Sequence, residues 1–189
     1  MAAAMTSPQY ALVAYVKGAV ADFVSQIRRE LHPPQAHLPA HLSILPPRPL
    51  HGSEGDALEL AEGICSTTMP FEAMLGDVES FFPITPTVFI RVAYAAYRLR
   101  ELHDLMNTGA FAAEEQWPYM PHLTLFRMQD IAAAESALTV ATRRWSDYRD
   151  SRRLLIDQLT FVRQAGPDQW IDLAPIPLGH RLAPAGAAH

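Results

Sequence analysis

Apolar and polar residues follow one another along this chain in two patterns, one with the period of a strand and one with the period of an amphipathic helix. The patterns run in the order strand–helix–strand–helix–strand, and this order then begins again. Ser53 and Asp130 are the expected N-caps of two of the helices. The first series is expected at 10–16, 19–31, 41–45, 53–67 and 71–82. The second is expected at 87–93, 97–106, 122–126, 130–145 and 153–163, with a last strand at 169–173.

Prolines and turn residues set several of these boundaries. Pro33 and Pro34 are expected to end the first helix, and Pro46 and Pro47 to close the strand at 41–45, because proline lacks the amide hydrogen that helix and sheet need. The turn at 166–168 is expected to pair the last strand with the long strand before it.

The repeated order indicates two related halves. HLS begins at His41 and HLT begins 81 residues later (122 − 41), and the first strands of the halves are offset by about as much. Two units are too few for a solenoid. We therefore expect one α+β domain over residues 1–180. Its two lobes would be antiparallel sheets related by a pseudo-twofold axis, with outer helices and a central cleft. The Ala/Pro-rich tail at 181–189 is expected to be disordered.

The two repeated strands each present a polar pair. Side chains at i and i+2 of a strand share one face, so His41 lies beside Ser43 and His122 beside Thr124, while the apolar residues between them face the other way. A third match to histidine–any–hydroxyl, at 51–53, falls in an expected loop and is the chance occurrence that eight histidines predict. The two good copies both read H-L-[ST]-[IL]-[LF], both follow a proline closely, and both occupy the same place in the duplicated pattern.

With these motifs the sequence resembles the 2H phosphoesterase superfamily, also called the LigT-like or 2′-5′ RNA ligase family. Its members carry one H-x-[ST]-x motif in each lobe, matched here by HLSI at 41–44 and HLTL at 122–125, with PHLTLFR at 121–127 nearest to the usual second motif. Ser43 stands where threonine is more common. The strand–helix order matches from about Tyr10 to Leu178. The resemblance implies the two-lobed LigT-like fold.

The resemblance also implies the chemistry. It predicts a phosphodiesterase that needs neither metal nor cofactor and acts on 2′,3′-cyclic phosphates or on 2′-5′ linked RNA or nucleotides, with ligation as the reverse reaction. One histidine would be the general base and the other the general acid. We assign His122 to the nucleophile and His41 to the leaving oxygen, and the sequence also permits the opposite. Ser43 and Thr124 would donate to the non-bridging oxygens.

Substrate-binding candidates lie near both motifs. Arg127 occupies the position where the family often has a basic residue that contacts phosphate, and Arg48 is a looser candidate for the same role. Trp117 and Tyr119 precede the second motif and could stack on a base.

The amino-acid composition limits the kinds of substrate and partner that we expect. The net charge of −5 does not favour extended binding to nucleic acid, so the expected substrate is a nucleotide or an RNA end. No apolar run is long enough for a membrane span, and residues 1–9 do not resemble a signal peptide. The single cysteine, Cys65, is expected to be buried and fits a reducing compartment, so we expect a cytoplasmic protein. The oligomeric state is left open.

The same residues permit other interpretations of the site and of the function. His32, His37 and His41 lie close in sequence, but the prolines between them and the lack of cysteine or acidic partners argue against a metal site. His103 is expected to be exposed on its helix, and the acidic residues at 77 and 79 to face solvent. Two other functions stay open: a non-catalytic nucleotide- or RNA-binding module, and a hydrolase of cyclic oligonucleotide signals.

Overall fold

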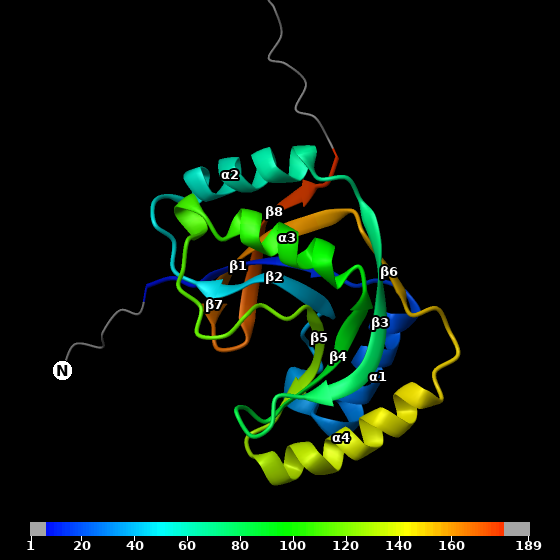
Figure 1. Ribbon diagram of the computed structural model, residues 1–189. Coiled ribbons are helices and arrows are strands. Elements are labelled where there is room, and N and C mark those ends of the chain that lie inside the picture. The colour runs from blue at the N-terminus through cyan, green and yellow to red at the C-terminus, as the bar shows by residue number, and fades with distance from the viewer. Residues whose placement is uncertain (1–6, 180–189) are drawn as a thin grey trace, which may run out of the picture.

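The computed structural model describes residues 7–179, and its framework is one sheet of eight antiparallel strands (Figure 1). The strands are β1 (Tyr10–Tyr15), β2 (His41–Arg48), β3 (Phe71–Ser80), β4 (Thr87–Tyr94), β5 (His122–Arg127), β6 (Arg153–Ile156), β7 (Gln158–Gly166) and β8 (Gln169–Pro177). The helices are α1 (Ala19–Leu31), α2 (Glu54–Thr67), α3 (Ala96–Met106) and α4 (Ile131–Ser146), with short 3-10 turns at Pro33–Gln35 and Gly109–Phe111. The predicted tail at 181–189 lies outside the described residues.

The strand order is β6-β3-β4-β5-β2-β1-β7-β8. The two strands that carry the histidine motifs, β2 and β5, lie side by side at its centre and are joined by a single register pair, Leu42 with Leu123. The prediction of two separate sheets is therefore wrong, because this pair joins two four-stranded halves into one sheet. The α+β class is confirmed. A pseudo-twofold relation between the halves stays a prediction.

The helices cross between the halves. α1 follows β1 in sequence but packs against β5, and α3 follows β4 but packs against β2. α2 and α3 cover the half that contains β1, β2 and β8, and α1 and α4 lie over β3, β4 and β5 (Figure 1). The largest buried side chains, among them Leu12, Ile90, Phe126 and Phe161, come from both halves and form one apolar core.

Local sequence signals placed the helices well. Ser53 caps α2 in a reciprocal capping box with Asp56, and the Asp130 side chain accepts from the Ala133 amide at the start of α4. Cys65 is buried on α2, and burial raises the pKa of its thiol to about 12. The predicted hairpin of β7 and β8 is present, with Asp168 in the left-handed conformation that its tight turn needs.

Two strand predictions were wrong. β2 does not stop at residue 45 but runs through both prolines to Arg48. Its register with β1 shifts there, since Leu12 faces Leu45 while Tyr10 faces Arg48, and such a bulge tolerates residues that cannot donate to the ladder. The expected strand at 153–163 is broken at Asp157. β6 pairs with β3 in one half and β7 pairs with β1 in the other.

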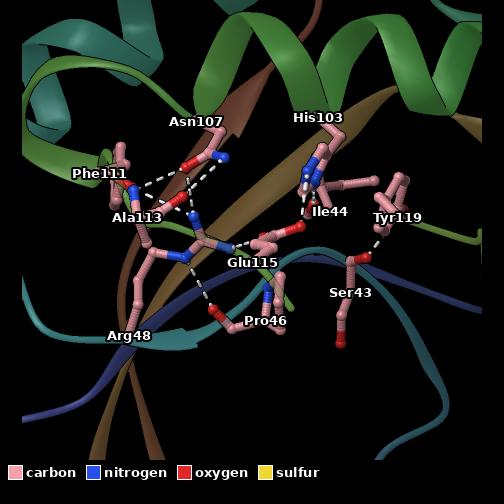
Figure 2. Close-up of polar contacts among 10 residues, drawn as sticks. All are labelled: Ser43, Ile44, Pro46, Arg48, His103, Asn107, Phe111, Ala113, Glu115 and Tyr119. Atoms are coloured by element: carbon pink, nitrogen blue, oxygen red, sulfur yellow. Dashed lines mark hydrogen bonds and ion pairs between the residues drawn. The ribbon is translucent and has the colours of Figure 1, made fainter. Parts of the chain in front are cut away.

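A buried polar network fixes the connection between α3 and β5 (Figure 2). Arg48 is only 4% exposed, and its guanidinium donates to the Asn107 side chain at 2.7 Å and to the Phe111 carbonyl at 3.1 Å. The same guanidinium forms an ion pair with the Glu115 carboxylate. This pair holds the loop after α3 against the end of β2.

His103 extends this network toward the first histidine motif. Its Nδ1 lies 2.7 Å from the Ile44 carbonyl and its Nε2 lies 3.2 Å from Glu115, so both ring nitrogens face oxygen acceptors. Tyr119 stacks on its ring at 4.1 Å between centroids, and the Tyr119 hydroxyl donates to the Ser43 carbonyl at 2.8 Å (Figure 2). The prediction of an exposed His103 is wrong, because this side of α3 packs on β2 and leaves the residue 3% exposed.

The ion pair yields a stability prediction. Glu115→Ala should lower the free energy of unfolding by about 2–3 kcal/mol, because it leaves the buried Arg48 charge without its carboxylate. The value is below that of a fully buried pair because the Glu115 side chain is 21% exposed. Urea unfolding measures the change. Glu114→Ala, at an exposed neighbouring position, is the control and should change the free energy by less than about 0.5 kcal/mol. Equal effects of the two substitutions would contradict the network's contribution.

Candidate active site

The pairing of β2 with β5 brings the two motifs together. Since the leucines of the two motifs face each other in antiparallel register, His41 lies opposite Thr124 and Ser43 lies opposite His122. The leucines are fully buried on one face, so the histidines and hydroxyls share the other face. The two histidines are diagonal neighbours, and diagonal positions of an antiparallel pair are separated by about 7–8 Å. That separation leaves room for one phosphate group between two imidazoles.

Both histidines are held in the same way. Nδ1 of His41 lies 2.9 Å from the Pro39 carbonyl, and Nδ1 of His122 lies 2.6 Å from the Met120 carbonyl. A carbonyl only accepts, so each Nδ1 carries the hydrogen and each Nε2 is the nitrogen left for chemistry. The acceptor is the residue two positions before the histidine in both motifs. This arrangement fixes the tautomer of both rings.

Burial lowers the pKa of both histidines below its ordinary value. For His41 the positive charges of Arg28 and His122 lower it further, and the Pro39 carbonyl acts in the opposite direction. The His122 ring packs edge-on against Phe81, with 5.0 Å between centroids, and also contacts Phe89 at 5.1 Å. Both side chains remain half-buried rather than enclosed. Neutral imidazole is therefore favoured at each position.

Arg28 is a site residue that the sequence analysis missed. It lies on α1, is 3% exposed, and donates to the carbonyls of Leu125 at 2.7 Å, Thr124 at 2.8 Å and Leu38 at 2.6 Å. Burial lowers its pKa to about 10, so it still carries its charge at neutral pH. Within the described part of the chain, Arg28 forms no ion pair with a carboxylate. Its positive charge can therefore act on a ligand in the site.

A signal for Arg28 was present in the sequence. Val20, Val24 and Ile27 form the buried stripe of α1, and position 28 follows Val24 by four residues, which places an arginine on the same apolar face. A charged residue on such a face has either a buried partner or a ligand.

A cavity of about 760 Å³ opens beside the motifs. Its lining includes His41, Ser43 and Thr124, together with Arg28 and Arg127. His122 is not part of that lining. The cavity lining therefore includes one motif imidazole, both motif hydroxyls and two guanidinium groups.

The predicted substrate-binding residues separate into two groups. Arg127 is exposed and lines the cavity, in agreement with its expected position. Arg48 and Tyr119 do not line it, because both are used in the buried network behind β2. Trp117 is 58% exposed and also lies outside the cavity lining. The structure therefore brings Arg127 to the cavity and leaves Arg48, Tyr119 and Trp117 outside its lining.

Within residues 7–179, no group of three or more histidine, cysteine or acidic side chains is arranged to hold a metal ion. His37 instead lines the cavity, with Nε2 3.1 Å from the Asp168 carbonyl.

Among the helices of residues 7–179, none is long and apolar enough to cross a membrane. Of the two acidic strand residues, Glu79 is paired with Arg91 at 3.1 Å.

Solved structures show the same fold. E. coli LigT in complex with NADP⁺ superposes with a TM-score of 0.64 at 17% identity, over 92% of this chain and 99% of LigT. The complex of LigT with 3′-AMP gives a TM-score of 0.61 at 14% identity, over 91% of this chain and 99% of the other. At these identities the likeness concerns the fold.

Sequence comparisons identify the family. A Geobacillus thermodenitrificans protein, provisionally named a phosphoesterase, is 25% identical over 132 residues, which cover 68% of this chain and 73% of the relative. A Bacillus mycoides protein with the same provisional name is 27% identical over 139 residues, 72% and 78% of the two chains. Residues 16–168 match the 2′-5′ RNA ligase superfamily, and the chain therefore belongs to this family of 2H phosphoesterases.

Proposed function

We propose that this protein is a phosphodiesterase that opens 2′,3′-cyclic phosphates, or cleaves 2′-5′ linked nucleotides, by acid–base catalysis with His41 and His122 and without a metal. The observation that carries the proposal is the matched pair of imidazoles at the β2–β5 pair, each with Nδ1 bonded to a carbonyl and Nε2 left available. E. coli LigT has been crystallised with ATP and with 3′-AMP, which supports a nucleotide as the substrate.

The chemistry follows from this geometry. A water oxygen attacks phosphorus as the bond to one ribose oxygen breaks. The base accepts the proton of the water while the acid supplies a proton to the departing ribose oxygen, so that a phosphomonoester and a free hydroxyl result. Ser43 and Thr124, each opposite the other motif's histidine, can donate to the non-bridging oxygens as negative charge builds. In the ligase direction a ribose hydroxyl takes the place of water.

The electrostatics of the site suit a phosphate. Arg28 and Arg127 bring positive charge to the cavity beside the motifs, and among residues 7–179 no carboxylate forms an ion pair with Arg28. The cavity volume is in the range that single small ligands occupy, which favours one nucleotide or one strand end. A cyclic oligonucleotide presents the same phosphodiester to the same residues and belongs in the substrate panel.

Loss of either motif histidine tests the mechanism. His41→Ala and His122→Ala should each lower turnover of a 2′,3′-cyclic nucleotide by at least about 10²-fold, because each removes one proton transfer. The assay is run in EDTA, and products are identified by chromatography. His51→Ala, at the exposed chance copy of the motif, is the control and should keep full activity. Full activity of a motif variant would refute the two-histidine mechanism, and activity that requires added zinc would refute metal independence.

The lowered pKa values predict the pH profile. A bell is expected, since one imidazole must be neutral and the other charged. Burial lowers the pKa of both free-enzyme histidines below the ordinary value of about 6.5, so the maximum of kcat/KM should lie below about pH 6.5. A bound phosphate anion favours imidazolium, so the kcat profile should lie at higher pH. A maximum of kcat/KM above about pH 7.5 would contradict the assignment of these groups.

The Arg28 charge can be tested through His41. Arg28→Gln removes a positive charge that lowers the pKa of His41, so that pKa should rise, whereas Arg28→Lys keeps the charge and should leave it nearly unchanged. Titration of the His41 ring by NMR measures the shift. The His51 ring serves as the internal control in the same spectra. Equal His41 pKa values in the Gln and Lys variants would show that the Arg28 charge does not reach the site.

A further inference from the structure

The cavity continues from His41 across the neighbouring strands. In the register of β1 with β2, Tyr15 faces His41 and Val13 faces Ser43, so alternate residues of β1 share the face of the motif. Ala11 is the next residue on that face, and β7 adds Val162 opposite it. Ala11, Val13 and Val162 form a small apolar cluster separate from the main core. They line the cavity as a floor of short side chains.

An aromatic side chain stands over this floor. Trp170 of β8 is half-buried and packs against the apolar cluster together with Tyr15, and both rings line the cavity. The cavity therefore has an aromatic wall, formed by Trp170 and Tyr15, beside short apolar side chains. The Tyr15 ring also contacts His41 edge-on, with 6.5 Å between centroids. The aromatic wall is thus continuous with the catalytic histidine.

Two acidic residues of the β7–β8 hairpin line the cavity. Asp172 follows Trp170 by two residues on β8, and one of its carboxylate oxygens accepts a hydrogen bond from the Tyr15 hydroxyl at 2.6 Å. Asp168, in the turn of this hairpin, lines the cavity as well. Arg28 donates to two carbonyls of β5 and Arg127 belongs to β5, so both guanidinium groups lie on the β5 side, which β2, β1 and β7 separate from β8 in the sheet. A molecule with an anionic end and a flat end that carries N–H donors matches this distribution of charge.

We propose that this wall is a nucleobase-binding subsite, in which Trp170 stacks on the base of the substrate and Asp172 accepts a hydrogen bond from an exocyclic amino group. The proposal rests on the proposed phosphodiesterase function. A carboxylate repels phosphate and accepts from the exocyclic amino group that adenine, guanine and cytosine carry and uracil lacks, so we expect a preference for these three bases. With the base on the β1–β7–β8 side, the ribose lies nearest His41. That placement assigns His41 to protonation of the leaving ribose oxygen and His122 to activation of water.

The first test separates the base from the phosphate. Trp170→Ala should raise KM for adenosine 2′,3′-cyclic phosphate by at least about tenfold, because stacking on one base contributes about 1–3 kcal/mol. KM for an abasic ribose 2′,3′-cyclic phosphate should not change, and Trp170→Phe should retain much of the stacking. Trp117→Ala, at the exposed tryptophan before the second motif, is the matched control and should leave both KM values unchanged. An equal rise with both substrates, or the loss appearing in the Trp117 variant, would overturn the subsite.

A binding measurement keeps the subsite and the reaction apart. Calorimetric titration with adenosine 3′-monophosphate and with inorganic phosphate needs no turnover. Trp170→Ala should weaken the nucleotide by at least about tenfold and leave phosphate unchanged. Binding that depends on Trp170 without any turnover would refute the reaction and keep the subsite, whereas turnover of abasic and adenosine substrates at equal KM would do the reverse. Asp172→Asn should reduce the preference for adenosine over uridine 3′-monophosphate, and an unchanged preference would remove Asp172 from the subsite.

Discussion

The site depends on the contact between β2 and β5, because only this pair brings the two motifs onto one face. The ladder there has a single register pair, which is little to hold two four-stranded halves in place. The crossing helices supply the missing hydrogen bonds. Arg28 of α1 donates to the Leu125 carbonyl of β5, and His103 of α3 bonds the Ile44 carbonyl of β2. Each carbonyl belongs to the residue three positions after a motif histidine.

Arg28 and His103 are both buried and each bonds a motif strand, but their ion pairing differs. His103 and Arg48 share Glu115, so their network is neutralised internally and serves to hold the loop before β5. Arg28 bonds neutral carbonyls and keeps its full charge at the edge of the cavity. A buried uncompensated charge is costly, and a phosphate ligand would offset that cost. The ion-paired network and the positive charge at the cavity therefore come from different residues, although both join a helix to a motif strand.

The sequence predicted what local periodicity and spacing determine. It placed the helices, the caps Ser53 and Asp130, and the alternation that puts His41 and Ser43 on one face. It did not predict contacts between distant segments. The break at Asp157 was missed because apolar residues alternate on both sides of it, while the partners of β6 and β7 lie in different halves. His103 was misplaced for the same reason, since its burial depends on α3 crossing to β2.

The two halves repeat their motif but not its surroundings, and this difference can separate the roles of the histidines. His122 is packed against the rings of Phe81 and Phe89, which close its side of the site. Among the aromatic contacts of residues 7–179, His41 has one, edge-on with Tyr15, and it lines the same cavity as the short residues and Trp170. The cavity is lined by His41 and not by His122, so under the proposed function the nucleoside would lie beside His41 and the attacking water beside His122. Two chemically equal imidazoles thus face unequal neighbours, and the flanking strands, rather than the motifs themselves, would decide which one serves the ribose oxygen.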